Sequence, residues 1–141
     1  MDSYHNFIDW LKRFECGRQL QSLLEATVPE GEETVFLKTD RDNNMPIVFL
    51  AHNQSFIVNG TINFFNENPD VQFTVRKISD ITQKNIQMMT ISHGEITAFS
   101  RFKDVQLELT FQDGSQLLLN KVDFGIHNNS FITTVQSLLK C

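Results

Sequence analysis

The sequence predicts an α+β fold in which an antiparallel sheet of roughly seven to nine strands, strongly curved or closed into a barrel, ends in a C-terminal helix. Three observations lead to this prediction. Short segments of alternating apolar and polar residues recur along most of the chain, turn-forming residues separate them, and the hydrophobic period becomes helical at both ends. A cone-shaped α+β fold around a pocket is the alternative.

Length and composition indicate one domain with a substantial core. The chain has 141 residues, of which 40% are hydrophobic and 13 are Phe, so a core forms without disulfides or metal ions. We divide it into an N-terminal helical region (1–28), a strand region (33–121) and a C-terminal helix (128–140). The two cysteines suggest no disulfide framework, and no signal sequence or membrane-spanning segment is recognised. We therefore expect a cytoplasmic protein.

Residues 1–28 carry apolar side chains at helical spacing. Ser3 or Asp2 is a suitable N-cap, and Pro29 ends the pattern. Gly17 interrupts it, and because glycine in a helix costs about 1 kcal/mol relative to alanine, we expect a kink or two separate helices there. The apolar stripe consists of Tyr4, Phe7, Ile8, Leu11 and Phe14, followed by Leu20, Leu23 and Leu24.

Segments typical of strands follow from residue 34 onward. Asn59-Gly60 is a strong signal for a two-residue hairpin turn, and His93-Gly94 is a weaker one. Residues 47–51 are apolar without interruption, which is typical of a central strand. The strands expected before the C-terminal hairpin are 34–39, 47–51, 56–58, 61–65, 71–76, 86–91 and 95–101.

The clearest pattern lies near the C-terminus, where a hairpin is predicted to precede a helix. Residues 105–111 alternate between apolar and polar, which predicts a strand with Leu109 facing the core. Asp113-Gly114 is predicted to form a type I′ turn to a partner strand at 117–119. The helical face expected to cover the sheet contains Phe131, Val135 and Leu138, with Ile132 and Leu139 beside it.

The net charge of −5 is unevenly distributed. Residues 1–70 contain 11 acidic and 5 basic residues, whereas residues 71–141 contain 6 and 7. The acidic first half argues against nucleic-acid binding, which needs a concentrated basic face. Two kinds of interaction residue are still candidates: Trp10, which anchors a partner or packs against the sheet, and Arg76, Lys77, Arg101 and Lys103, which form a basic patch or a solvated sheet face.

No catalytic or metal-binding motif is recognised. Asp40-x-Asp42-x-Asn44 copies the start of an EF-hand loop, but Met45 replaces the required Gly and Ala51 the required Glu, so we interpret it as a turn. The histidines lack metal-ligand spacing, and neither a nucleophile elbow nor a glycine-rich phosphate loop occurs. We assign no catalytic residue, cofactor or metal ligand; a composite site across strands stays open for His52, His93 and His127.

The terminal unit, DVQLELTFQDGSQLLLN followed by NSFITTVQSLL, resembles the pleckstrin-homology-like superfold and its small bacterial relatives. The resemblance covers residues 34–140 and implies a barrel closed by the C-terminal helix; the N-terminal helical region is extra. Members that bind phosphoinositides carry Lys and Arg in the first loop, whereas residues 39–44 here are mostly acidic or neutral. Phe131 is the only aromatic residue in the helix, where eukaryotic members have a Trp. Binding of lipid head groups is therefore not implied.

Three functions are compatible with these observations. The first is a non-catalytic cytosolic domain that recognises a protein or peptide partner, through an exposed sheet edge or the groove beside the C-terminal helix. The second is a small-molecule carrier or isomerase-like pocket protein. The third is an acidic immunity or chaperone-type protein that masks a basic partner. The oligomeric state is left open. The candidate pocket residues of the second function are Met88, Met89, Phe99 and Phe102, with His52 or His93 as the base.

Overall fold

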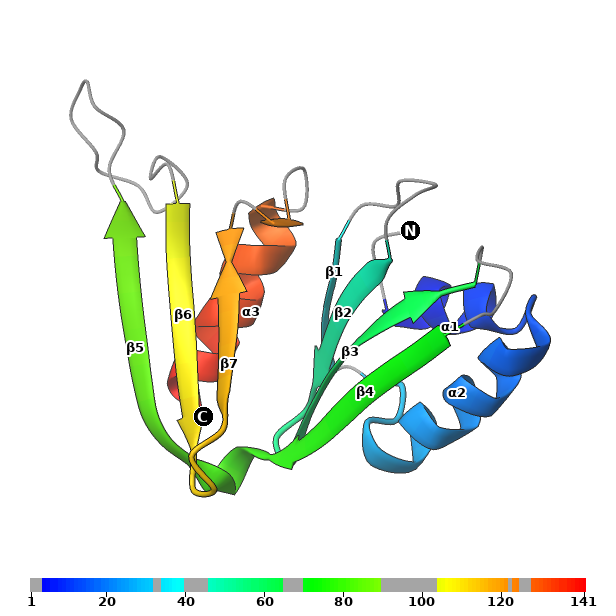
Figure 1. The fold of residues 1–141 in the computed structure, drawn as a ribbon, viewed down its shortest axis with the longest axis horizontal. Helices are drawn as coiled ribbons and strands as arrows, with labels where there is room; N and C mark the ends of the chain where they lie inside the picture. Colours follow the sequence, from blue (N-terminus) through cyan, green and yellow to red (C-terminus); the bar gives the residue numbers. More distant parts are fainter. Residues whose placement is uncertain are drawn as a thin grey trace. The chain divides into compact units, whose positions relative to one another are not determined.

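The computed structural model describes residues 4–31, 34–39, 46–64, 70–89, 104–121, 123–124 and 128–141. These residues form an α+β structure with three α-helices and two antiparallel sheets of four and three strands (Figure 1). The chain divides into two compact units, Met1–Ile78 and Ser79–Cys141. The elements are α1 Tyr4–Leu11, α2 Glu15–Thr27, β1 Val35–Lys38, β2 Ile47–His52, β3 Phe56–Asn63, β4 Asp70–Lys77, a 3-10 turn Ile78–Asp80, β5 Ile81–Met89, β6 Asp104–Phe111, β7 Gln116–Asn120 and α3 Asn128–Lys140.

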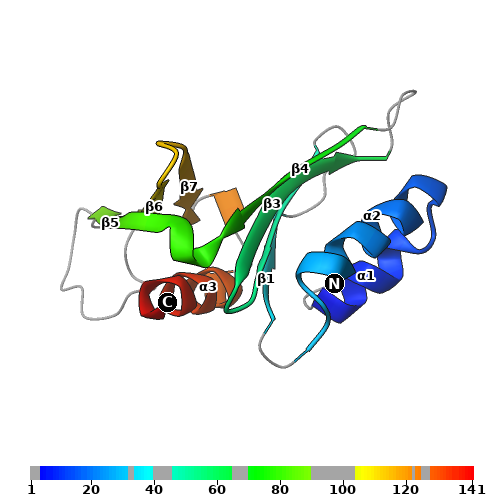
Figure 2. The ribbon, with the colours of Figure 1, turned by 90° about the horizontal axis from the view of Figure 1, so that it is seen from below.

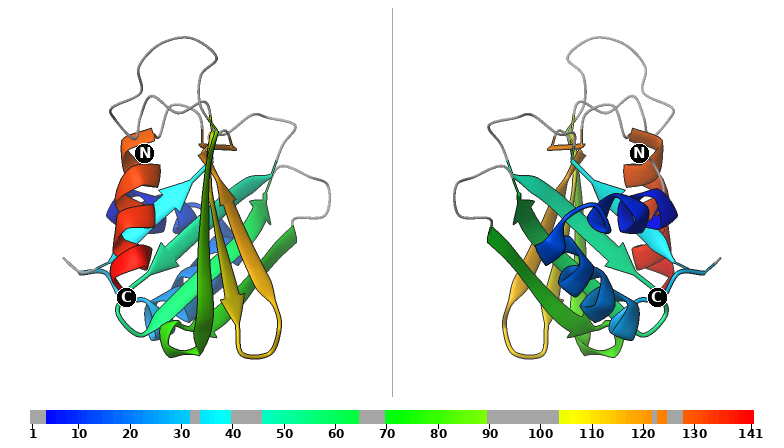
Figure 3. Two further views of the ribbon diagram at one scale, coloured as in Figure 1. Left: turned by 90° about the vertical axis from the view of Figure 1, so that its left-hand side faces the viewer. Right: turned by 90° about the vertical axis from the view of Figure 1, so that its right-hand side faces the viewer.

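In the first unit, α1 and α2 cover one face of the four-stranded sheet (Figure 2; Figure 3, right). The strand order is β1-β2-β3-β4, so each strand pairs with its neighbour in sequence. The apolar run of β2 is buried at Phe49, which faces the helices, and also at Leu50, which faces the opposite side. This confirms the central strand that residues 47–51 predict.

Aromatic side chains from α1 and the sheet form the centre of this unit's core. Phe7 is fully buried, with its ring centroid 4.7 Å from that of Phe36 and 5.4 Å from that of Phe49. Trp10 stacks on Phe64 with 5.6 Å between centroids. Aromatic pairs of this kind contribute about 0.5–1.5 kcal/mol each beyond the buried area. The other buried members of this cluster are Tyr4, Ile8, Leu11, Leu20, Leu24, Val28, Ile47, Ala51, Val58 and Ile62.

The two N-terminal helices are separate, which is one of the two outcomes predicted, but the break does not occur at Gly17. α1 ends at Leu11 and α2 begins at Glu15, so Gly17 lies in the first turn of α2. A Cβ at Gly17 would lie 2.1 Å from the carbonyl oxygen of Leu11. Glycine is therefore needed for the close approach of α2 to the end of α1, not to interrupt a helix. The proposed N-caps lie outside the described residues.

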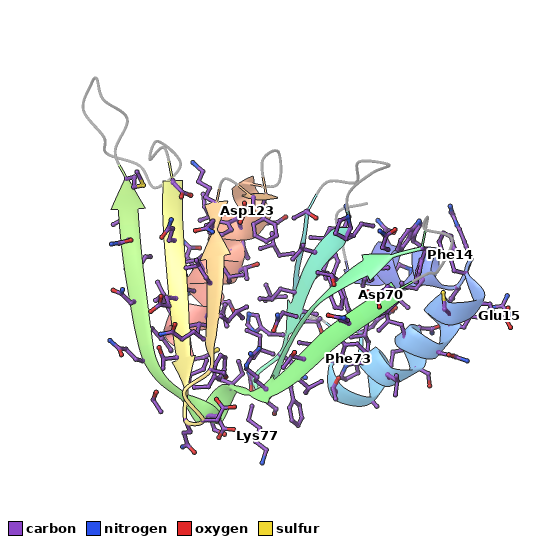
Figure 4. All side chains as sticks on the ribbon, in the orientation of Figure 1. Phe14, Glu15, Asp70, Phe73, Lys77 and Asp123 are labelled. Atoms are coloured by element: carbon purple, nitrogen blue, oxygen red, sulfur yellow. The ribbon has the colours of Figure 1, made fainter. Side chains whose placement is uncertain are left out.

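The prediction of a hairpin turn at Asn59-Gly60 is wrong, because both residues lie inside β3. β3 is a central strand, and Gly60 pairs with Phe49 on one side and with Phe73 on the other. A Cβ at Gly60 would lie 2.1 Å from the carbonyl oxygen of Gln72 and 2.6 Å from the Cβ of Phe73. Glycine thus makes room for Phe73, which packs against the core (Figure 4).

The turn that actually joins β2 to β3 is built around Asn53. Its side-chain Oδ1 accepts hydrogen bonds from the backbone N–H groups of Ser55 and Phe56, both at 2.8 Å. Its Nδ2 donates to the carbonyl of Thr27 at 3.3 Å. One asparagine therefore closes the hairpin as an Asx turn and ties it to the last residue of α2.

In the second unit, α3 lies against one face of the sheet β5-β6-β7 (Figure 2). The side chains of β6 are alternately half-buried and fully buried, as the sequence predicts for a strand with one face on the core. The predicted face of α3 is confirmed, whereas Leu139 is exposed. The buried residues among those described in this unit are Val105, Leu107, Leu109, Phe111, Leu117, Leu119, Lys121, Phe124, Phe131, Thr134, Val135 and Leu138.

The turn between β6 and β7 contains Asp113-Gly114, as predicted, but it is not type I′. Gly114 has a φ of 85°, and no other described residue has a positive φ, whereas type I′ requires two. The N–H of Gly114 donates to the carbonyl of Phe111, and the N–H of Phe111 donates to the carbonyl of Ser115, both at 2.9 Å. This is the pattern of a type I turn followed by a left-handed glycine. Asp113 Oδ1 accepts from the Ser115 N–H at 2.9 Å and stabilises it.

A closed barrel is not found among the described residues, whose strands form two separate hydrogen-bonded sheets. The α+β class and the antiparallel pairing are confirmed. Alternation along a strand predicts which face is buried, but it does not specify how the edge strands of a sheet are paired. The predicted strand 95–101 and the His93-Gly94 turn lie outside the described residues, and the single domain stays a prediction.

Candidate interaction site

Of the described strands of the second unit, the edge strand β5 is the most exposed. Six of its nine side chains are exposed, and Lys84 is its only charged residue. Met88 and Met89 are 46% and 52% exposed. The left view of Figure 3 looks onto this edge, and no other described element of the second unit lies in front of it. No described strand pairs with this side of β5, and an edge strand presents backbone N–H and C=O groups to a partner.

The register with β6 assigns the side chains of β5 to two faces. Ile86 lies opposite Leu107 and Met88 opposite Val105, so both are on the side that α3 covers. Lys84 is on this side as well. The residues between them face outward, because successive side chains alternate. The outward set consists of Gln83, Asn85, Gln87 and Met89.

Lys84 connects β5 to the end of α3. Its Nζ donates a hydrogen bond to the backbone oxygen of Cys141, the residue that follows the helix. A cation near the C-terminus of a helix also interacts favourably with the unpaired carbonyls there. The contact places the end of α3 beside the middle of β5, on the same side as Ile86 and Met88.

Sequence reasoning places this strand at 86–91 and misses its first half. The cause is an irregularity between Ile81 and Gln83, which makes Thr82 an extra residue relative to β6. Ile81 lies opposite Phe111 and Ile86 opposite Leu107, so the two isoleucines share a face although they are five positions apart. The alternation of inward and outward side chains from Ile81 to Met88 is recognisable only when Thr82 is treated as an inserted residue.

Polar side chains occur on the outward face of every strand of the three-stranded sheet, together with Met89 and Leu118. On β6, Gln106 donates to Asp104 at 3.3 Å. Glu108 accepts from Gln116 of β7 at 3.4 Å. Leu118, which is 50% exposed, lies opposite Glu108 on the same face. The face is solvated, so the backbone edge of β5 is the feature of this sheet best suited to contact a partner.

The predicted interaction residues do not form one patch. Trp10 is 6% exposed and belongs to the core of the first unit, which is a packing position. Arg76 Nη1 donates to Asn59 Oδ1 at 2.8 Å, whereas Lys77 is exposed at the end of β4 (Figure 4). As neighbours in a strand, Arg76 and Lys77 point to opposite faces. Arg101 and Lys103 lie outside the described residues.

The predicted pocket residues are not brought together within the described part of the chain. Met88 and Met89 point to opposite faces of β5, so they do not line one cavity. His52 is 2% exposed, and burial lowers its pKa. Its Nδ1 lies 3.1 Å from the carbonyl of Asn53, and its Nε2 has no hydrogen-bond partner among the described residues. The other candidates, Phe99, Phe102, His93 and His127, lie outside the described residues.

A charged cluster joins the start of α1 to the segment after α2. His5 Nδ1 lies 3.0 Å from Glu30 Oε2, and His5 Nε2 lies 3.2 Å from Asp9 Oδ2. The hydrogen bond to Glu30, followed by the charges of Asp9 and Glu30, raises the pKa of His5. The two carboxylates contact different ring nitrogens, so they do not converge on one metal ion, and no described His, Cys, Asp and Glu residues form a metal-binding group of three.

This cluster makes part of the stability pH-dependent. Because folding raises the pKa of His5, its contribution is fully present below the ordinary value of about 6.5 and is lost as the pH rises through the folded-state pKa. We expect the urea midpoint of the wild type to exceed that of His5→Gln at pH 5.5 and the difference to shrink toward pH 8.5. Removing the partner carboxylate with Glu30→Gln should also shrink the difference in urea midpoint that His5→Gln causes at pH 5.5. A difference that grows with pH would contradict the assignment.

Comparison of the chain with models of protein families, with curated proteins and with solved structures finds no match. Among the described helices, none combines the length and apolar character needed to cross a membrane.

Proposed function

We propose that this protein is a small non-catalytic interaction domain that binds an extended segment of a protein partner by adding it as a strand to β5. The observation that carries the proposal is β5 itself, a nine-residue edge strand with six exposed side chains and one charge. In strand addition, main-chain hydrogen bonds supply affinity and alternate side chains supply specificity. This mode needs no catalytic group, in agreement with a sequence that contains no catalytic motif.

The side chains of β5 define the kind of segment that fits. On the α3 side, Ile86 and the exposed Met88 favour apolar residues at every second position of the partner. On the outer side, amide side chains favour polar residues. The expected partner is therefore an extended segment that alternates between apolar and polar residues, with its apolar side turned toward α3.

Membership of the pleckstrin-homology-like superfold belongs to the same proposal. It is supported by the order of the elements, in which four antiparallel strands and then three antiparallel strands precede a C-terminal helix. The two N-terminal helices are additional to that plan.

The test is selection of linear peptides from a displayed library against the full chain. We expect a selected peptide to slow amide hydrogen exchange in β5 but not in β7. Met88→Asp should weaken its binding by about tenfold or more, because an apolar contact is replaced by a charge. Leu118→Asp, which changes an equally exposed residue on the outer face, should leave binding unchanged.

Protection that appears outside β5, or equal losses in the two variants, would contradict the proposal. Binding that weakens steeply with salt would favour the alternative of an acidic protein that masks a basic partner. A small molecule that accompanies the purified protein in native mass spectrometry would favour the pocket alternative.

A further inference from the structure

The seven residues of β5 that follow the irregularity at Thr82, Gln83–Met89, are suited to pair with themselves. When two copies of one strand pair antiparallel about a two-fold axis, each residue lies opposite its mirror position in the other copy. The register that overlaps all seven residues is centred on Ile86. In this register the two sheet faces that α3 covers lie on the same side of the joined sheet, because directly opposite residues share a face.

The charges of β5 are compatible with this register. Lys84 is the only charged residue of the strand, and it lies opposite Met88 of the second copy. A register centred on Lys84 would instead place two lysines directly opposite, which is destabilising. On the outer face, Asn85 lies opposite Gln87, so two pairs of amide side chains meet across the junction.

The same register accounts for the two exposed methionines. Met88 would be covered by the aliphatic part of the second copy's Lys84, whose charged end already reaches the carbonyl oxygen after α3. Met89 would lie beside Gln83 on the outer face. Both methionines are about half exposed in the single chain, and each gains a neighbour through the pairing.

We propose that two copies of this chain associate through β5, antiparallel and centred on Ile86, so that the two three-stranded sheets form one six-stranded sheet. The inference rests on the proposed function, because it uses the same strand-accepting edge of β5, here for a second copy of the chain. A strand pair buries less surface than a standard interface, so we expect a weak dimer with a dissociation constant roughly in the micromolar range.

Sedimentation velocity on the full chain tests this proposal. We expect the fraction of dimer to rise between about 1 and about 500 µM, which brackets the affinity of weak interfaces. Two double variants test the register: Asn85→Lys with Gln87→Lys, and Asn85→Lys with Gln87→Glu. Both positions are exposed on the outer face, and the variants differ only at position 87, so any effect of the first substitution on folding is common to both.

In the proposed register, position 85 of one copy lies opposite position 87 of the other. The Lys–Glu variant should therefore dimerise roughly tenfold more tightly than the Lys–Lys variant. A wild type that stays monomeric across the whole range, or equal dimerisation of the two variants, would overturn the proposal. A monomer that still binds selected peptides at β5 would refute the dimer alone, whereas absence of peptide protection would refute the proposed function.

Discussion

Replacing Phe7 by Ala is expected to lower the free energy of unfolding by about 3–5 kcal/mol, because the substitution removes a fully buried ring and leaves a cavity. The ring contacts Phe36, Phe49 and Trp10, with centroids at 4.7, 5.4 and 6.2 Å. Trp10 is the only Trp of the chain and belongs to the same cluster. Its fluorescence during urea unfolding therefore reports directly on the affected region.

The matched control is Leu23→Ala, which removes a large apolar side chain from an exposed position of α2. Surface substitutions of this kind change stability by less than about 0.5 kcal/mol. If both variants shifted the urea midpoint by similar amounts, the aromatic cluster would not be the centre of the first unit.

Leu109→Ala is expected to cost about 2–5 kcal/mol in the second unit. Leu109 is fully buried in the central strand β6, with Lys84 of β5 and Leu117 of β7 as its cross-strand neighbours. The loss should appear in the urea midpoint followed by circular dichroism. Amide hydrogen exchange should also become faster along β6.

Leu118→Ala is the control for the strand register. It makes the same chemical change on β7, at a side chain that is half exposed on the outer face. We expect a change of less than about 0.5 kcal/mol. Equal losses at the two positions would mean that the inward and outward faces of the sheet are assigned incorrectly.

The two proposed uses of β5 exclude each other, because a peptide strand and a second copy would bind the same backbone groups. The apparent affinity for a selected peptide should therefore fall as the total protein concentration rises above the dimerisation midpoint. Self-pairing would in that case protect an exposed edge strand until a partner is present, which is one way in which proteins limit unwanted edge-to-edge aggregation.

The sequence was sufficient for the elements whose hydrophobic period is regular. The alternation that includes Leu109 predicts the buried face of β6, and the spacing of Phe131, Val135 and Leu138 predicts the buried face of α3. Both predictions succeed because each side chain's face follows from its position within one regular element. Most of the candidate site was not predictable, because the extra residue at Thr82 shifts the period of β5.

What the sequence by itself determined is thus the α+β class, the antiparallel strands and the buried faces of β6 and α3. Only the tertiary structure distinguished the glycine that forms a turn from the two that allow a close contact. Gly60 makes room for Phe73 of the neighbouring strand, Gly17 makes room for the end of α1, and Gly114 is the glycine with a left-handed turn conformation among the described residues. A glycine is a turn signal locally, but whether it forms a turn or a close contact depends on which distant residue packs against it, and the local sequence does not encode that neighbour.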